Sequence, residues 1–222
     1  MESDLLYNIE LFVYCVDMPR YALMFSLGLA ALSGCGGGDA GITPLMRAAR
    51  VGAIDEMKTL LDEGADPDAR DFGNGWTALH HAIHKQQLEA VRLLLDRGVS
   101  PNRAVRGTTA LMMAAMERDP AILELLLSRG ARAEDRAFDG STALTIAVSG
   151  GALMDIDRPL FGGCHPATVR ALMTHDPALT LPESMRGREA LFWARFHGCD
   201  DVLKMISCSA GPQACKDQPK QP

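Results

Sequence analysis

Three histidines stand close together in the sequence, at His80, His81 and His84. Imidazole nitrogens are common ligands for zinc and other transition metals. His80 and His84 are four residues apart, so a helix would carry both side chains on one face. A metal site is therefore one interpretation of this cluster, and the elements that would position it decide between that role and a structural one.

The other residues suited to chemistry match no known catalytic pattern. Asp66, Asp68 and Asp71 lack the Gly and Glu spacing of a calcium-binding loop. The sequence has no His-Glu-x-x-His, Gly-x-Ser-x-Gly or phosphate-binding loop. The formal net charge is −6 and no basic patch emerges, so nucleic acid is not expected as a partner. We predict no enzymatic activity, no cofactor, no metal and no small-molecule substrate.

Four cysteines lie near the C-terminus, at Cys164, Cys199, Cys208 and Cys215. Four cysteines permit three disulfide connectivities. No Cys-x-x-Cys pair is present, which argues against a zinc site. Disulfides persist in exported proteins, whereas in a cytosolic protein the same residues would be free or buried thiols.

Residues 18–35 have the order of an export signal. Arg20 gives a short positive start, and the apolar run over 21–32 follows it. This run of about a dozen residues is too short to span a bilayer, which takes about 20, but it has the length of a signal-peptide core. Residues 1–17 are acidic, unlike the start of a signal peptide, so we expect translation to begin at Met18. The alternative is a short buried helix that precedes the rest of the chain.

The run ends in Leu32-Ser33-Gly34-Cys35, which resembles the lipobox of bacterial lipoproteins. The resemblance implies cleavage before Cys35 and attachment of lipid to its sulfur. Gly36, which is not an Asp, then implies transfer to the outer membrane. The expected division is a signal peptide at 1–34 and a lipidated, Gly-rich tether at 35–40, on the periplasmic side. If the signal is not used, the protein would be cytoplasmic.

Beyond the tether, a glycine recurs at spacings of 34, 32, 33 and 47 residues, at Gly41, Gly75, Gly107, Gly140 and Gly187. A Thr-Pro-Leu or Thr-Ala-Leu triplet follows each of the first four, and Glu189-Ala190-Leu191 follows the last. Seven residues after each glycine stands an alanine, at Ala48, Ala82, Ala114, Ala147 and Ala194. Second helices are expected to begin near Met57, Val91, Leu123 and Leu203, and three of them to end in Gly64, Gly98 and Gly130. In the fourth unit the second helix begins near Val169, which indicates an insertion at roughly 151–163.

This pattern resembles the ankyrin repeat, most closely in Thr77-Ala78-Leu79-His80-His81-Ala82. The resemblance implies an all-α solenoid of about five helix-turn-helix repeats with hairpin loops over 41–208, followed by a tail at 209–222. Each repeat would start at its glycine, with a Thr cap on the first helix and a left-handed Gly after the second. It also implies that His80 bonds the backbone of the neighbouring hairpin, which favours a structural role over metal binding.

Ankyrin geometry favours one disulfide connectivity, Cys164–Cys199 with Cys208–Cys215. Cys164 and Cys199 would each precede a second helix in adjacent repeats, so their bond would pin the insertion. The other pair would clip the end of the last helix to the tail.

Ankyrin domains bind partners through their hairpin tips and the concave face of the first helices. The corresponding helix positions are Arg47, Arg50, His81, His84, Met113, Met116, Ile146, Trp193 and Phe196, and the tips offer Phe72, Trp76 and Phe138. Trp, Met and Arg are enriched in interfaces, and a row of exposed apolar side chains is costly unless something covers it. The alternative is that Met113, Ile146 and Trp193 lie in the seams between repeats.

The expected function is therefore protein binding. Bacterial ankyrin lipoproteins that this chain resembles act as immunity proteins, neutralising toxins such as phospholipases that rival cells deliver into the periplasm, for example by type VI secretion. In that role the insertion, with Met154, Pro159, Leu160 and Phe161, would serve as a plug. Other proteins it resembles are scaffolds or assembly factors for an endogenous enzyme such as catalase in oxidative-stress defence, and a structural envelope protein is a third option. Fold alone does not identify the partner.

Overall fold

The computed structural model describes residues 41–150 and 163–209. Within these ranges the chain forms ten helices and no strand, with one isolated bridge between Val105 and Thr108. The helices are α1 (Pro44–Val51), α2 (Ile54–Asp62), α3 (Ala78–His84), α4 (Leu88–Asp96), α5 (Ala110–Glu117), α6 (Pro120–Ser128), α7 (Ala143–Ser149), α8 (Pro166–His175), α9 (Met185–Phe196) and α10 (Asp200–Ser209).

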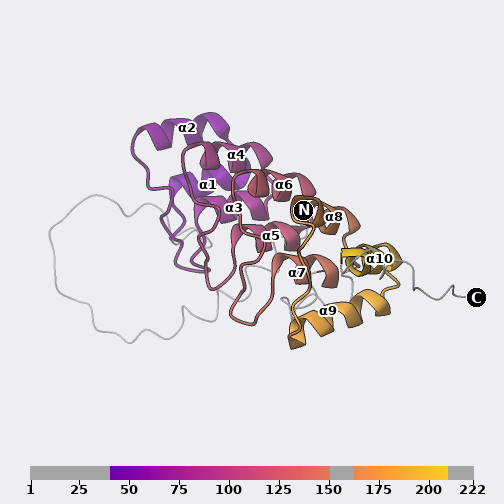
Figure 1. Ribbon diagram of the computed structural model, residues 1–222. Helices are drawn as coiled ribbons and strands as arrows, with labels where there is room; N and C mark the ends of the chain where they lie inside the picture. Colours follow the sequence, from indigo (N-terminus) through magenta and orange to yellow (C-terminus); the bar gives the residue numbers. More distant parts are fainter. Residues whose placement is uncertain (1–40, 151–162, 210–222) are drawn as a thin grey trace, which may run out of the picture.

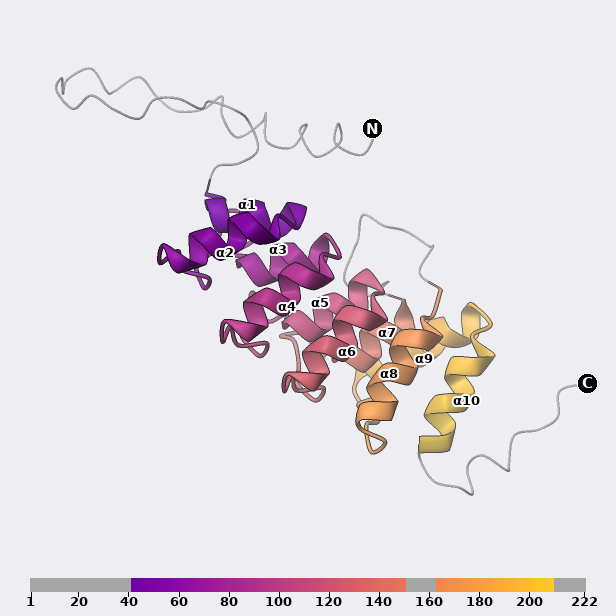
Figure 2. The same cartoon turned by 90° about the horizontal axis from the view of Figure 1, so that it is seen from above.

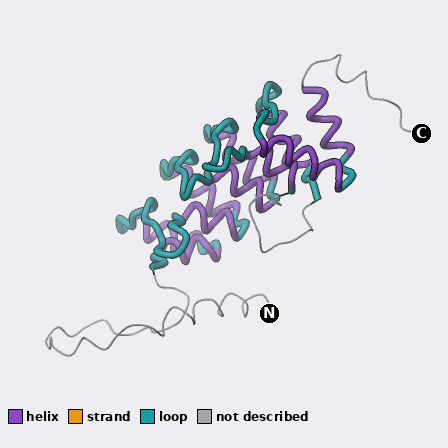
Figure 3. Tube along the Cα trace, turned by 90° about the horizontal axis from the view of Figure 1, so that it is seen from below, coloured by secondary structure: helices purple, strands orange, loops and turns teal. Residues whose placement is uncertain are grey.

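The helices stack in two layers, as Figures 1 and 2 show. The odd-numbered helices form an inner row in which α1 packs on α3, α3 on α5, α5 on α7 and α7 on α9. The even-numbered helices form an outer row in the same order, and each inner helix packs on the outer helix that follows it. The longer loops project on one side of these layers (Figure 3). The predicted all-α repeat architecture is thus confirmed.

Threonine side chains begin three of the inner helices as the sequence predicts. Thr43 accepts from the backbone N–H of Met46, and Thr109 does the same for Met112 at the start of α5. At α7 the pattern recurs with Thr142. These bonds satisfy N–H groups that have no partner inside the helix. Thr77 differs because its Oγ1 instead bonds Nδ1 of His80, at 2.8 Å.

Glycines end the first three outer helices in the left-handed conformation, as expected. Gly64, Gly98 and Gly130 have φ of 89°, 85° and 83°. A side chain at this φ would be strained, and glycine adopts it freely. The turn after each outer helix is therefore set by one residue.

Alanine and leucine make up most of the buried core, which both rows of helices share. The repeated alanines, Ala48, Ala82, Ala114, Ala147 and Ala194, are each at most 1% exposed. Their small side chains let neighbouring inner helices approach closely, while Leu45, Leu79, Leu111 and Leu144 fill the space between them, each at most 2% exposed. The repeat spacing thus places the same two residue types at the same seam in four successive repeats.

The last repeat departs from the predicted repeat spacing. Gly187 was aligned with the turn glycines, but α9 already begins at Met185, and the cap is Ser184 rather than Glu189. Gly187 therefore lies in the first turn of the helix, directly against the carbonyl oxygen of Pro182. The segment before α9 approaches the helix so closely at this position that only a residue without a side chain fits.

In the described ranges, every helix is too short or too polar to cross a membrane. The predicted signal peptide and tether lie outside these ranges.

We predict that Gly187→Ala destabilises the last repeat. A Cβ at this position would overlap the Pro182 carbonyl oxygen, and backbone must shift to make room. Overpacking of this kind costs about 1–3 kcal/mol, although Gly→Ala within a helix otherwise gains about 1 kcal/mol. Urea unfolding should show a net loss.

Gly163→Ala is the matched control, because a Cβ there meets nothing within 4 Å. Its unfolding midpoint should stay close to that of the parent. Equal stability of the Gly187→Ala and Gly163→Ala proteins would contradict the close approach of Pro182 to α9.

Candidate partner-binding surface

The predicted contact residues differ in how much surface they offer. Arg47, Arg50, Phe72, Phe138 and Phe196 are exposed, and Trp76, His84, Met116 and Trp193 are partly exposed. The remaining three, His81, Met113 and Ile146, are buried. The available surface therefore lies at the hairpin tips, on α1 and α3, and on α9.

The burial of Met113 and Ile146 corrects the sequence-based assignment. Their exposed fractions are 3% and 0%, so neither side chain offers area to a partner. Both belong to the continuous core cluster, because α5 and α7 have a neighbouring inner helix on each side. Their burial agrees with the alternative that they are seam residues. Trp193 is only partly buried, because α9 is the last inner helix of the described stack.

Asp71 fixes the hairpin loop before α3 to that helix. One carboxylate oxygen accepts from the backbone N–H groups of Asn74 and Gly75, at 2.7 and 2.8 Å. The other lies 2.9 Å from Nε2 of His81, and both side chains are largely buried. Burial lowers the pKa of His81, so at neutral pH the uncharged ring donates its Nε2 proton to the carboxylate. A single side chain thus holds the loop in one conformation.

Trp76 lies on the two histidines of α3 that the sequence placed in the binding surface. Its ring is 5.4 Å from that of His81, edge-on, and 5.1 Å from that of His84. His84 Nδ1 in turn lies 2.7 Å from the Glu117 carboxylate at the end of α5. We call Trp76, His81 and His84 the Trp76 cluster. Because these contacts hold each ring, the partly exposed Trp76 and His84 present a preformed aromatic surface, and the buried His81 supports Trp76. Arg50 lies close enough for its charge to lower the pKa of His81.

His80 points into the core instead of joining this cluster. It is 1% exposed, and its Nε2 has no hydrogen-bond partner in the structure. The expected bond to the neighbouring hairpin is therefore not formed, and Thr77 bonds the ring through Nδ1. Burial, followed by the nearby charge of His81, lowers the pKa of His80 from 6.5 to about 4.

The three histidines thus turn to three different partners, Thr77, Asp71 and Glu117. Within residues 41–150 and 163–209, no group of three or more His, Cys, Asp or Glu side chains is arranged to hold a metal ion. Each histidine is accounted for by a contact within the fold or by burial.

The two phenylalanines at the hairpin tips each lie over the glycine that begins their own repeat. Phe72 contacts Gly41 and Phe138 contacts Gly107, so closely that a Cβ on either glycine would overlap the ring. The rings nevertheless stay 88% and 89% exposed. Each tip therefore carries a large apolar side chain that packs on a glycine on one side and is otherwise open to solvent.

The second aromatic group lies on α9 at the far end of the described stack. Phe192 and Phe196 stack at 6.2 Å, and Trp193 contacts both of them edge-on. The Trp193 ring also stacks on His197, at 5.8 Å. Trp193 and Phe196 were among the predicted contact residues and Phe192 was not, although its spacing of four residues from Phe196 already places both on one helix face.

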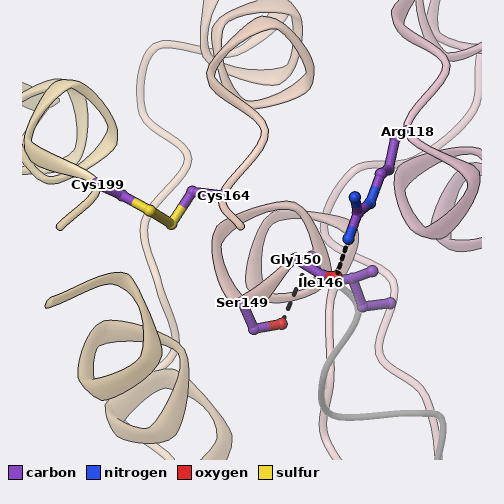
Figure 4. The surroundings of a disulfide bond; sticks show 6 residues. All are labelled: Arg118, Ile146, Ser149, Gly150, Cys164 and Cys199. Atoms are coloured by element: carbon purple, nitrogen blue, oxygen red, sulfur yellow. Dashed lines mark hydrogen bonds between the residues drawn. A yellow bond between two sulfur atoms is a disulfide. The ribbon is translucent and has the colours of Figure 1, made fainter. Parts of the chain in front are cut away.

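The disulfide Cys164–Cys199 is present, as predicted from the ankyrin arrangement. The two Cα atoms are 6.0 Å apart, and the cysteines are separated by 35 residues. Figure 4 shows Cys164 in the segment that enters α8 and Cys199 just before α10. On the other side of the insertion, the Arg118 guanidinium donates to the Gly150 carbonyl, at 3.1 Å. Both flanks of the insertion are thus attached to neighbouring repeats.

Several predicted features lie outside the described residues. These are the lipidation site Cys35, the insertion residues 151–162 with Met154, Pro159, Leu160 and Phe161, and Cys215. The side chain of Cys208 is likewise not described, so the second predicted disulfide stays a prediction.

Comparison with known proteins agrees with the observed architecture. A family model for ankyrin repeats (3 copies) matches residues 26–105 and 111–217, which is most of the chain. Of the described stack, the match leaves out only residues 106–110.

Individual relatives match only part of this chain and a small part of their own length. Mitochondrial disaggregase of Bos taurus is 36% identical over 138 residues, covering 60% of this chain and 20% of that protein. Neurogenic locus notch homolog protein 4 of Homo sapiens is 35% identical over 125 residues, covering 50% and 6%. The E3 ubiquitin-protein ligase KEG of Arabidopsis thaliana is 39% identical over 92 residues, covering 41% and 6%. The chain spans a fifth or less of the length of these three relatives, and their names describe different activities.

The buried His80 should make stability fall in mild acid. Its pKa is about 4 in the folded protein and near 6.5 when exposed, so unfolding takes up a proton below pH 6.5. This contribution is present in full above pH 6.5 and is lost as the pH falls towards 4, by roughly 3 kcal/mol in total. Urea unfolding between pH 7 and pH 4 measures it.

The His80→Gln variant supplies the comparison. Its free energy of unfolding should depend less steeply on pH over that range, because unfolding takes up as much as one proton fewer than in the parent. This holds whatever the stability of the variant at pH 7. An identical slope in both proteins would show that His80 is not kept neutral by the fold.

Removing the disulfide should destabilise the last two repeats. A bond that closes a loop over a separation of 35 residues contributes about 3–4 kcal/mol by restricting the unfolded chain. The Cys164→Ser/Cys199→Ser protein should lose about this much in urea unfolding. Peptide mapping without reductant should recover Cys164 linked to Cys199, and recovery of alkylated Cys164 from oxidised protein would contradict the pairing.

Proposed function

The chain belongs to the ankyrin-repeat family, and on this premise we propose that it is a membrane-tethered periplasmic protein that binds and neutralises a toxic effector. Ankyrin repeats imply a protein-binding module. The observation that carries the proposal is the preformed surface around α3, where the Trp76 cluster lies beside the exposed Arg50.

This surface has the composition and rigidity of an interface. Tryptophan and arginine are the side chains that most often dominate binding energy. Trp76 is held by ring contacts and its loop by the Asp71 carboxylate, so little side-chain or loop freedom remains to be lost on binding. An inhibitor that acts by occlusion needs only such a surface and no chemistry of its own.

The tip residues extend the same surface along the loops. Phe72 and Phe138 are almost fully exposed, and each lies on the glycine that begins its own repeat. Exposed aromatic side chains in this arrangement are costly unless a partner covers them. The proposed contact area therefore runs from α1 and α3 across the loop tips.

Two features support placement in the periplasm. The Cys164–Cys199 disulfide is of the kind that persists in oxidising compartments. Residues 18–35 have the order of a lipoprotein signal, with Cys35 at the lipidated position. From Cys35 to Gly41 the chain extends at most about 20 Å, at ~3.4 Å per residue, so the repeats would be held close to the membrane.

The test is to cross-link the protein in intact cells through a photoreactive residue at position 72, and to identify what is attached. Cells are grown alone and beside toxin-delivering siblings. We expect a delivered hydrolase in near-equal amount, and loss of its enzymatic activity when the purified chain is added. Recovery of a resident enzyme such as catalase would replace immunity with the scaffold role.

Variants then locate the contact. Trp76→Ala combined with Arg50→Glu should weaken partner binding at least tenfold and leave the helical content and unfolding transition in place. Arg92→Glu on the outer helix α4 is the matched charge reversal, and it should bind as the parent does. Equal loss in both variants, or full binding by the first, would move the contact away from α3.

Localisation is checked separately with Cys35→Ser. The parent should fractionate with the envelope and incorporate labelled palmitate, and the variant should do neither. An unlabelled parent in the soluble cytosol would contradict the periplasmic proposal.

A further inference from the structure

One face of α9 carries a row of large apolar side chains, called here the stripe, that is open to solvent. Met185, Phe192 and Phe196 are 73%, 60% and 66% exposed. At 100° per residue these three positions fall within a narrow arc of the helix. Met185 and Phe196 are eleven residues apart, or about 16 Å at 1.5 Å per residue, so the stripe runs the length of the helix.

The stripe lies opposite the face that packs into the stack. Gly187, Ala190 and Ala194 are buried, and they occupy the other side of α9, where it meets α7 and α10. Every earlier inner helix has a further inner helix packed beyond it. Among the described residues, no further inner helix packs on α9. Its apolar stripe therefore lies on the face where the next inner helix of a longer stack would pack.

The border of the stripe is positively charged along one edge. Arg188 and Arg195 are exposed and lie seven residues apart on the same side of α9. Among the described residues, no carboxylate forms an ion pair with either of them. On the other edge, Glu189 is already paired with Arg186, whose guanidinium also contacts Asp139, both at 3.1 Å. The uncompensated charge of this face is therefore basic.

We propose that this face of α9 docks an amphipathic helix of a partner protein, with apolar residues towards Met185, Phe192 and Phe196 and carboxylates towards Arg188 and Arg195. The partner helix continues the inner row of the stack. A helix is the fitting occupant because a straight apolar stripe two to three turns long matches the stripe of another helix. A strand would gain no backbone hydrogen bonds, since those of α9 are satisfied within the helix.

The proposal rests on the protein-binding role proposed above, and it adds a second contact surface with its own chemistry. It is independent of the surface at α3 and of the identity of the partner. Its test therefore uses a defined probe.

The probe is a labelled helical peptide with leucine and alanine on one face and glutamate along the edge of that face. A second peptide carries lysine in place of each glutamate. Fluorescence anisotropy with the full chain should show binding of the glutamate peptide at least tenfold tighter than that of the lysine peptide. The preference should weaken with added salt.

Charge reversal in the protein makes the test specific. In Arg188→Glu/Arg195→Glu the preference should invert, so that the lysine peptide binds more tightly. Phe192→Asp/Phe196→Asp should bind neither peptide, while Val51→Asp, an exposed apolar residue on α1, should leave binding unchanged. Far-ultraviolet circular dichroism verifies that each variant is folded.

Four outcomes would overturn the proposal. Equal binding of both peptides would show that the arginine edge does not select. Concentration-dependent self-association that Phe192→Asp/Phe196→Asp abolishes would identify a second copy of the chain as the occupant. Binding that appears only after deletion of residues 210–222 would identify the chain's own tail. If neither peptide binds, this proposal fails too. The proposed function still stands in that case, provided that Trp76→Ala with Arg50→Glu weakens binding of the partner.

Discussion

Each repeat of this chain has apolar side chains that only a neighbouring repeat can cover, and the rest of the structure depends on that constraint. The alanine of each inner helix is buried because a neighbouring helix lies against it. A single helix pair could not cover its own leucines, so stability arises at the interfaces between repeats. The ends of the described stack are where this constraint is relaxed. At one end α1 exposes Arg47 and Arg50, and at the other α9 exposes three large apolar side chains.

The sequence predicted most of the fold because the constraint repeats. Glycine, threonine, alanine and leucine recur at fixed positions, and in most copies each has one physical role: left-handed turn, helix cap, close approach and filling of the seam. The partner of Cys164 was predictable for the same reason, since the repeat geometry places it beside Cys199. Five copies of a weak signal constitute a strong one. The fold class and the first four repeats therefore follow from pattern alone.

The errors occur where a contact is made by one residue in one repeat. Gly187 matched the spacing of a turn glycine, yet it lies in the first turn of α9, where the Pro182 carbonyl leaves no room for a side chain. His80 matched the family position, but its Nε2 meets no acceptor. Met113 and Ile146 occupy the same helical position as exposed Arg47, and they are buried because their repeats are internal. Spacing identifies the helix face, whereas burial depends on what lies on either side of the helix.

The candidate binding surface depends on polar contacts that the repeat pattern does not specify. The Asp71 carboxylate joins two loop N–H groups to His81, and that helix residue supports Trp76. Asp71 is largely buried, so leaving its carboxylate without donors would cost far more than an exposed ion pair contributes. The loop conformation and the ring positions are consequently coupled, and neither can change alone. The repeats thus provide a rigid support, and a few residues found in a single repeat determine what that support displays to a partner.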